Sequence, residues 1–216
     1  DGISMEDSLP VHTQKLTLEI LSELSSGTYT FEDPLIIQNP YEITPLTALI
    51  AFETEISCQV RITVKGKTAS ADRTDLLDAA STHLVPVLGL YPDSENHILL
   101  ELLDKSGTAF KTQELTLQTE KLPEYLRTAL KTGSYTAASS MDLMLISGLG
   151  TPYLYAFDEF GDIRWYCTLE REYYGGFPLE NGHILTESPD VLFPNTSMPN
   201  SPEFVEIDWL GRASRL

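Results

Sequence analysis

The segment 155–166 (YAFDEFGDIRWY) returns 50 residues later as segment 205–216 (VEIDWLGRASRL). The positions that agree are Asp158 and Asp208, Phe160 and Leu210, and Gly161 and Gly211, with Pro152 and Pro202 three residues before each segment. A repeat of roughly 40 to 50 residues in a strand-rich sequence is typical of propeller blades. Because one blade cannot bury its faces alone, the repeat predicts the front part of a propeller.

The composition limits the partners of this chain. Its 14 Lys and Arg residues face 32 Asp and Glu residues, which gives a net charge of −18. Nucleic acids and anionic membranes both require clustered cations, so neither is expected as a partner. The sequence has no apolar run of the roughly 20 residues that a membrane helix needs. No signal peptide is visible at the start, although a cleaved one is compatible with it, so periplasmic, secreted and cytoplasmic locations stay open.

Histidine and cysteine offer no recognisable metal or cofactor site. The histidines do not lie at metal-ligand spacing from one another or from a cysteine: His12, His83, His97 and His183. We expect structural roles for His83 and His97 and solvent exposure for His183. Cys58 and Cys167 lie in apolar strand patterns, which favours free buried thiols over a disulfide. Phosphate-loop, GxSxG and HExxH motifs are absent from the sequence.

The hydrophobic pattern predicts an all-β chain in two parts. Residues 1–120 are predicted to form an N-terminal antiparallel β-sandwich, because short alternating strands are separated by turn residues. Its expected strands are residues 35–37, 48–54, 58–65, 83–90, 98–103 and 110–119. Residues 11–25 fit a short helix or an edge strand equally well. Residues 68–80 are polar, with a single helical turn expected near their end.

The second part is predicted to be the first blade of an incomplete β-propeller. Residues 121–140 have the composition of a linker with a short helix at 124–130, and residues 141–216 form the blade and the start of a second one. The expected strands of the first blade are residues 142–147, 152–158, 162–169 and 183–187. Asn181-Gly182 predicts a tight hairpin turn.

Two aromatic segments are candidates for ligand binding. Arg164 precedes Trp165 and Tyr166 on a predicted strand, so it can present a cation to a ligand, or it can extend along a packed blade. Tyr173 and Tyr174 precede two glycines, which permit close backbone approach. Their rings and hydroxyls suit a phenolic ligand in a channel, or they pack between blades.

Four segments resemble the bacterial aryl-sulfate sulfotransferases, in the order in which they occur along the chain. They are residues 27–54, residues 60–67 (VRITVKGK), residues 83–96 (HLVPVLGLYPDSEN) and residues 157–166. The most specific strings are Asn39-Pro40-Tyr41 with Pro45 to Leu49, and Gly89-Leu90-Tyr91-Pro92. The resemblance implies a small N-terminal β-sandwich followed by a six-bladed propeller.

The resemblance also implies an activity. These enzymes move a sulfuryl group from an aryl sulfate donor to a phenolic acceptor through a sulfated histidine, without a cofactor. In the family pattern a His-His-Asp motif follows the hairpin that corresponds to residues 208–212 here. The first repeat carries Tyr173-Tyr174-Gly175 at the matching place, and tyrosine cannot be equated with a sulfated histidine.

The sequence therefore predicts no catalytic residue in this chain, and the chain alone is expected to be inactive. Its expected partners are the remainder of the propeller and a second copy in a homodimer. The alternative is a non-catalytic β-sandwich that serves as a binding or dimerisation module.

Overall fold

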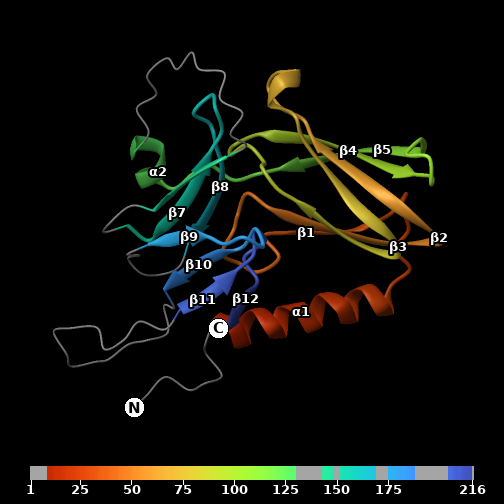
Figure 1. Cartoon of the computed structure of the whole chain (residues 1–216), viewed down its shortest axis with the longest axis horizontal. Helices are drawn as coiled ribbons and strands as arrows, with labels where there is room; N and C mark the ends of the chain where they lie inside the picture. The colour runs from red at the N-terminus through yellow and green to blue at the C-terminus, as the bar shows by residue number, and fades with distance from the viewer. Residues whose placement is uncertain (1–8, 130–142, 148–150, 169–174, 188–203, 216) are drawn as a thin grey trace.

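The computed structural model describes residues 9–129, 143–147, 151–168, 175–187 and 204–215 (Figure 1). The described part consists mainly of antiparallel strands. It begins with helix α1 (Leu9–Ser26), so the helical interpretation of residues 11–25 is confirmed. The helix buries Leu9, Thr13, Ile20 and Leu24 along one face. Figure 1 shows α1 running along one side of the molecule, from the C-terminal strands to the sandwich.

Five strands form the N-terminal sheet. They are β1 (Leu35–Gln38), β2 (Ala48–Val64), β3 (Arg73–Val87), β4 (Glu95–Leu103) and β5 (Ala109–Gln118). The long strand β2 pairs with β3 along one edge, and with β1 and then β4 along the other. The two strands expected at 48–54 and 58–65 are thus one strand, interrupted by register shifts at Cys58.

The sheet folds back on itself to give two layers. Its end strands approach each other, since Gln38 Nε2 donates a hydrogen bond of 3.0 Å to the carbonyl of Gln118. The core between the layers contains buried apolar residues from β2, β3 and β4, among them Ile50, Phe52, Val60, Val85, Leu100 and Leu102. The predicted antiparallel sandwich is confirmed. The helical turn expected near the end of residues 68–80 is wrong: Arg73 to Leu77 belong to β3 and pair with β2, which satisfies the backbone of this polar segment.

Two smaller antiparallel sheets follow. Helix α2 (Glu124–Ala129) lies in the expected linker. The first sheet contains β6 (Met144–Ser147), β7 (Tyr153–Phe157) and β8 (Ile163–Thr168). The second contains β9 (Gly176–Pro178), β10 (Ile184–Glu187), β11 (Phe204–Ile207) and β12 (Ala213–Arg215). In each sheet consecutive strands are neighbours, as they are in propeller blades.

One predicted strand belongs to the other sheet. The strand expected at 183–187 does not complete the sheet of β6, β7 and β8. As β10 it pairs with β9 and β11, where Ile184 lies opposite Ile207 and Thr186 opposite Val205. This register places buried side chains on one face of the sheet, which fixes the pairing.

The first sheet is the middle layer of the molecule. One of its faces packs against the second sheet through Leu154, Trp165 and Cys167. Tyr155 and Tyr166 belong to the same apolar core as the sandwich. Burial raises the pKa of Tyr166 to about 12, with a smaller contribution from Tyr153. The first sheet therefore joins the two halves of the described chain.

The 50-residue repeat corresponds to a repeated hairpin turn. Asp158 Oδ1 accepts hydrogen bonds from the backbone N–H groups of Phe160 and Asp162, and Asp208 Oδ1 accepts them from Leu210 and Arg212, all at 2.9 to 3.0 Å. The glycine of each turn has a positive φ, 82° at Gly161 and 93° at Gly211.

The same turn occurs once more in the described residues. In the sandwich, Asp104 Oδ1 accepts bonds from Ser106 and Thr108, and Gly107 has a φ of 80°. The predicted Asn181-Gly182 hairpin is confirmed, with only the glycine at positive φ. The Asp-x-x-Gly pattern therefore specifies a hairpin turn both in the sandwich and in the two smaller sheets.

In none of the described segments does a helix combine the length and apolar character needed to cross a membrane.

His83 is a buried core residue. Its side chain stacks on Phe52, with ring centroids 4.8 Å apart, and its Nε2 lies 3.0 Å from Thr54 Oγ1. Burial lowers the pKa of His83, because the charged imidazolium loses its hydration. The structural role predicted for His83 is confirmed, whereas His97 is mostly exposed.

We predict that His83 makes folding stability depend on pH. The folded-state pKa lies below the unfolded value of about 6.5, so the unfolded state binds the proton first as the pH falls. Stability is therefore full above this pH and declines below it. Urea midpoints measured from about pH 7.5 to 5.5 should fall for the wild type and stay flatter for His83→Gln. His97→Gln is the control, and an equal slope in wild type and His83→Gln would contradict the prediction.

Candidate functional site

Arg164 lies where the first sheet meets the sandwich. Its side chain is fully buried. Its Nε donates to the carbonyl of Gly89 at 2.8 Å. Its Nη1 donates to the Tyr91 hydroxyl and to Asp158 Oδ2, each at 2.9 Å. The guanidinium carbon also lies 3.7 Å from the centroid of the Tyr91 ring, which is a close cation–π contact.

This arrangement makes Arg164 a connecting residue. Asp158 is also almost fully buried, so the two charges are compensated within the protein. In the described structure the guanidinium faces protein groups and does not reach an open pocket, and its Nη2 has no hydrogen-bond partner there. Of the two sequence interpretations, packing within the molecule accounts for its position, although the side chain is buried and does not extend to solvent.

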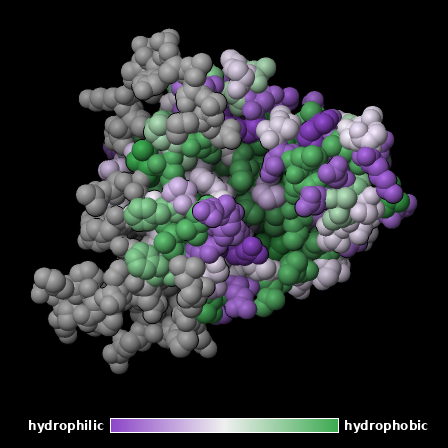
Figure 2. Space-filling model, in the orientation of Figure 1, coloured by the Kyte–Doolittle hydropathy of each residue, from purple (hydrophilic) through white to green (hydrophobic). Residues whose placement is uncertain are grey.

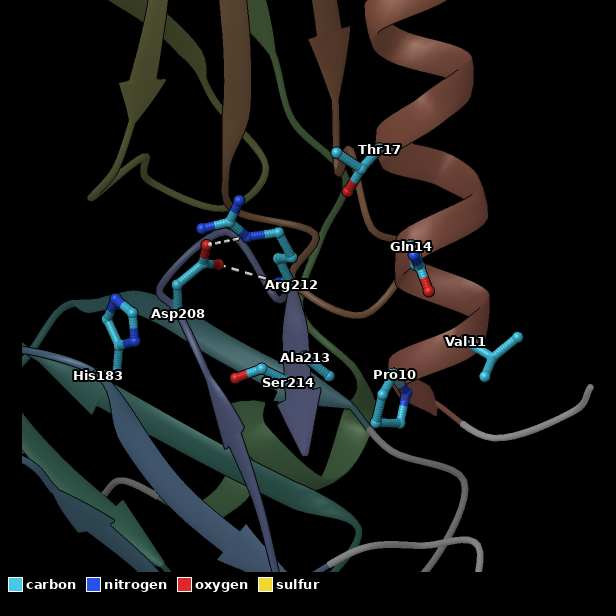
Figure 3. Close-up of a pocket in the computed structure, with 9 residues that line it drawn as sticks. All are labelled: Pro10, Val11, Gln14, Thr17, His183, Asp208, Arg212, Ala213 and Ser214. Carbon is cyan, nitrogen blue, oxygen red and sulfur yellow. Dashed lines mark hydrogen bonds and ion pairs between the residues drawn. The ribbon is translucent and has the colours of Figure 1, made fainter. Parts of the chain in front are cut away.

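An open groove of about 520 Å³ lies between α1 and the second sheet (Figure 3). The residues that line it come from the first half of the helix and from the turns and strand facing it: Pro10, Val11, Gln14, Thr17, His183, Asp208, Arg212, Ala213 and Ser214. Thr13 fixes the helix to the edge of β12, because its hydroxyl accepts a bond from the N–H of Ala213 and donates to the carbonyl of the same residue.

Each basic side chain of this groove lies beside a carboxylate. Arg212 Nε is 3.2 Å from Asp208 Oδ2, and Figure 3 shows the guanidinium turned toward that carboxylate. His183 Nδ1 is hydrogen-bonded to Glu206. A hydrogen bond from Asn181, followed by that of His183, lowers the pKa of Glu206. The groove therefore suits a neutral polar group better than an anionic sulfate ester.

A second groove of about 670 Å³ lies beside the junction of the sandwich and the sheets. Its lining includes the two tryptophans, Trp165 and Trp209, together with Arg73, Asp72 and Leu88. Both indole N–H groups already donate to backbone carbonyls, those of Trp209 and Gly182. Figure 2 shows apolar side chains in the hollow between the two parts of the molecule. The tryptophans therefore offer apolar ring surface here, without a free donor.

Tyr173 and Tyr174 lie outside the described residues. The glycines that follow them are described, and they do permit close approach. A Cβ at Gly176 would lie 2.9 Å from Leu154 Cδ2, so the start of β9 packs tightly against the first sheet. The phenol-binding role of the tyrosines stays a proposal.

The remaining histidines and the cysteines lie in surroundings that do not form a recognisable site. Within the described ranges, no group of three or more His, Cys, Asp or Glu side chains could hold a metal ion. Cys58 and Cys167 are buried thiols that do not form a disulfide with each other, as predicted. His183 is partly exposed and paired with Glu206, and His12 lies 2.9 Å from Glu42 at the surface. None of these histidines lies beside another in the described hydrogen bonds.

The fold defines a domain of the immunoglobulin-like class, followed by two antiparallel sheets. The family model of the arylsulfotransferase Ig-like domain matches residues 35–120. The matched segment is therefore an arylsulfotransferase N-terminal domain, as the resemblance implied, and it spans the five strands of the sandwich. Comparison of the chain with curated proteins gives no match.

Sequence reasoning missed that two of the segments described above meet in space. The Gly89-Leu90-Tyr91-Pro92 string and Arg164 form one cluster in the structure. The available signal was an arginine followed by two aromatic residues in a predicted strand, Arg164-Trp165-Tyr166. Spacing alone could not connect them, because the hydrogen bonds join residues 75 and 73 positions apart.

We predict that Arg164→Met destabilises the fold by about 3 to 5 kcal/mol, because it leaves Asp158 buried without its partner. Arg212→Met is the matched control, since it removes the exposed arginine that pairs with Asp208 of the second turn. It should cost under about 1 kcal/mol. Urea denaturation followed by circular dichroism measures both. Equal losses of unfolding free energy for the two variants would show that the buried pair stabilises the fold no more than the exposed pair does.

Proposed function

We propose that the chain forms the N-terminal part of an aryl-sulfate sulfotransferase whose sheets begin a propeller. Such an enzyme transfers a sulfuryl group from a phenolic sulfate ester to a second phenol through a sulfo-histidine. The observation that carries the proposal is the arylsulfotransferase Ig-like domain at residues 35–120, docked on two consecutive antiparallel sheets. Fold and domain match point the same way, and the activity itself is an inference from the family.

The proposed chemistry has two steps. A neutral imidazole attacks the sulfur of the donor, and the phenolate leaves with the electrons of the broken S–O bond. The acceptor phenol then attacks the sulfur of the sulfo-histidine, the S–N bond breaks and regenerates the neutral imidazole, and the proton of the acceptor passes to the phenolate released in the first step. Cations and hydrogen-bond donors around the sulfuryl oxygens would stabilise the charge that develops there. The described histidines are buried in the sandwich, exposed, or paired with carboxylates, so we assign this role to none of them.

We predict that the 216-residue chain by itself transfers no sulfuryl group. The test mixes the chain with p-nitrophenyl sulfate and phenol and follows p-nitrophenol release. Release at the rate of the buffer blank is the expected result. The full-length gene product is the positive control, and its inactivity toward a panel of aryl sulfates would contradict the proposed enzyme class.

We also predict that Tyr173 and Tyr174 line the entrance to the proposed channel. Replacing both with phenylalanine in the full-length protein removes two hydroxyls while keeping the rings. If these hydroxyls bind the acceptor, its KM should rise with a smaller effect on kcat. Tyr125→Phe, on α2, is the control. Unchanged KM and kcat in the double variant would dismiss the channel role.

The alternative proposal is a non-catalytic binding or dimerisation module. The observation in its favour is β3, which pairs with β2 alone among the described strands and leaves its other edge for an added strand. Light scattering of the chain with and without residues 1–120 tests whether the sandwich joins two copies. We also propose a periplasmic or secreted location, as the family resemblance implies.

A further inference from the structure

The first of the two equivalent turns is docked on the Ig-like domain. Its Asp158 is the partner of Arg164, which is held by Gly89 and Tyr91. Its Asp162 accepts hydrogen bonds of 2.7 and 2.8 Å from Lys67 Nζ. The same ammonium group lies 4.9 Å from the centroid of the Tyr91 ring. The turn is thus held at both of its acidic ends by cations bound to one tyrosine.

The second turn is docked on a different loop of the same domain. Thr44 Oγ1 donates a 2.6 Å hydrogen bond to the carbonyl of Leu210, and Thr44 is fully buried. The side chain of Leu210 packs in an apolar cluster with Ile20, Tyr41 and Leu49. Gly211 approaches Ile43 so closely that an added Cβ would lie 2.7 Å from Ile43 Cγ1.

Both loops are held in shape by side chains of the domain itself. Asn39 has a φ of 48°, and its Oδ1 accepts the N–H of Thr44 at 2.8 Å. Asn96 holds the other loop by accepting the N–H of Tyr91 at 2.7 Å and donating to its carbonyl at 3.0 Å. The domain's own side chains therefore fix the two loops, which makes them a preformed surface.

We propose that the Ig-like domain is a two-point docking surface for successive Asp-x-x-Gly turns, and that it sets the angle between the first and second sheets. Each sheet contributes one turn, and both turns are anchored to one rigid domain, so the sheets cannot rotate freely against each other. The third turn of this type, at Asp104, provides the comparison, since nothing lies within 4 Å of a Cβ built on its Gly107. This inference does not depend on the reaction that the protein catalyses.

The two tryptophans provide a spectroscopic probe of the angle between the sheets. Trp165 lies on β8 and Trp209 in the second turn, with ring centroids 4.9 Å apart and planes at 71°. Such a pair gives an exciton couplet in circular dichroism, whose size depends on the relative orientation of the rings. Gly211→Val places a branched side chain against Ile43 and should abolish the couplet while the β-sheet signal remains.

Gly107→Val is the matched control, because it puts the same strain on the same turn type at a φ of 80° without a neighbour. It should keep the couplet of the wild type. A couplet that survives equally in Gly211→Val would overturn the proposal, because the second anchor would then not set the angle.

The unaltered protein gives a second test that does not depend on the folding of any variant. A zero-length carbodiimide should join Lys67 to Asp162 by an amide bond, identified by peptide mass spectrometry. The Lys111–Glu32 pair, 2.5 Å apart within the sandwich, is the internal standard. Comparable yields of the two products support the docking, and Lys67→Gln should remove the Lys67–Asp162 product alone. Cross-linking of the standard pair without the Lys67 product would overturn the proposal.

Discussion

The buried guanidinium of Arg164 is the interaction on which the arrangement of this molecule depends. A fully buried charge is tolerated only when protein groups replace the water that would otherwise hydrate it. Here the replacement comes from both sides of the junction, since Asp158 belongs to the first sheet, and Gly89 and Tyr91 belong to the Ig-like domain. Separating the two parts would expose this charge to solvent or leave it buried without its hydrogen-bond partners. The sheet and the domain therefore stabilise each other in one relative position.

Apolar packing alone would not define that position so sharply. The tyrosines of the first sheet and the sandwich side chains form one continuous core, and large apolar faces tolerate several packing angles at similar cost. Directional hydrogen bonds at Arg164 and Thr44 discriminate among these angles, because a small rotation breaks them. These two buried polar residues fix the orientation of the sheets against the domain, a role that buried polar groups have in other folds.

The elements of this fold follow from local pattern, whereas their assembly does not. The alternation in β2 and β4, and the glycine of the Asn181-Gly182 hairpin, were sufficient to predict strands and turns. The sheet that β10 joins depends on its pairing with β11, a later segment of the chain, and no local period encodes that pairing. Likewise an arginine between apolar residues has the same local pattern whether it reaches solvent or is buried. Its environment is decided by loops of another domain.

The charge of the chain explains why the junction uses cations at all. With a net charge of −18, the acidic domain and the acidic sheets repel each other across any plain apolar contact. At the junction, Lys67 of the Ig-like domain pairs with Asp162 of the first sheet, while Lys65 pairs with Asp72 inside the domain and Arg164 with Asp158 inside the sheet. Few of the 14 basic residues are needed to reverse the local repulsion when they lie between the carboxylates of the two parts. The basic residues at this boundary thus turn a repulsive contact into an oriented one.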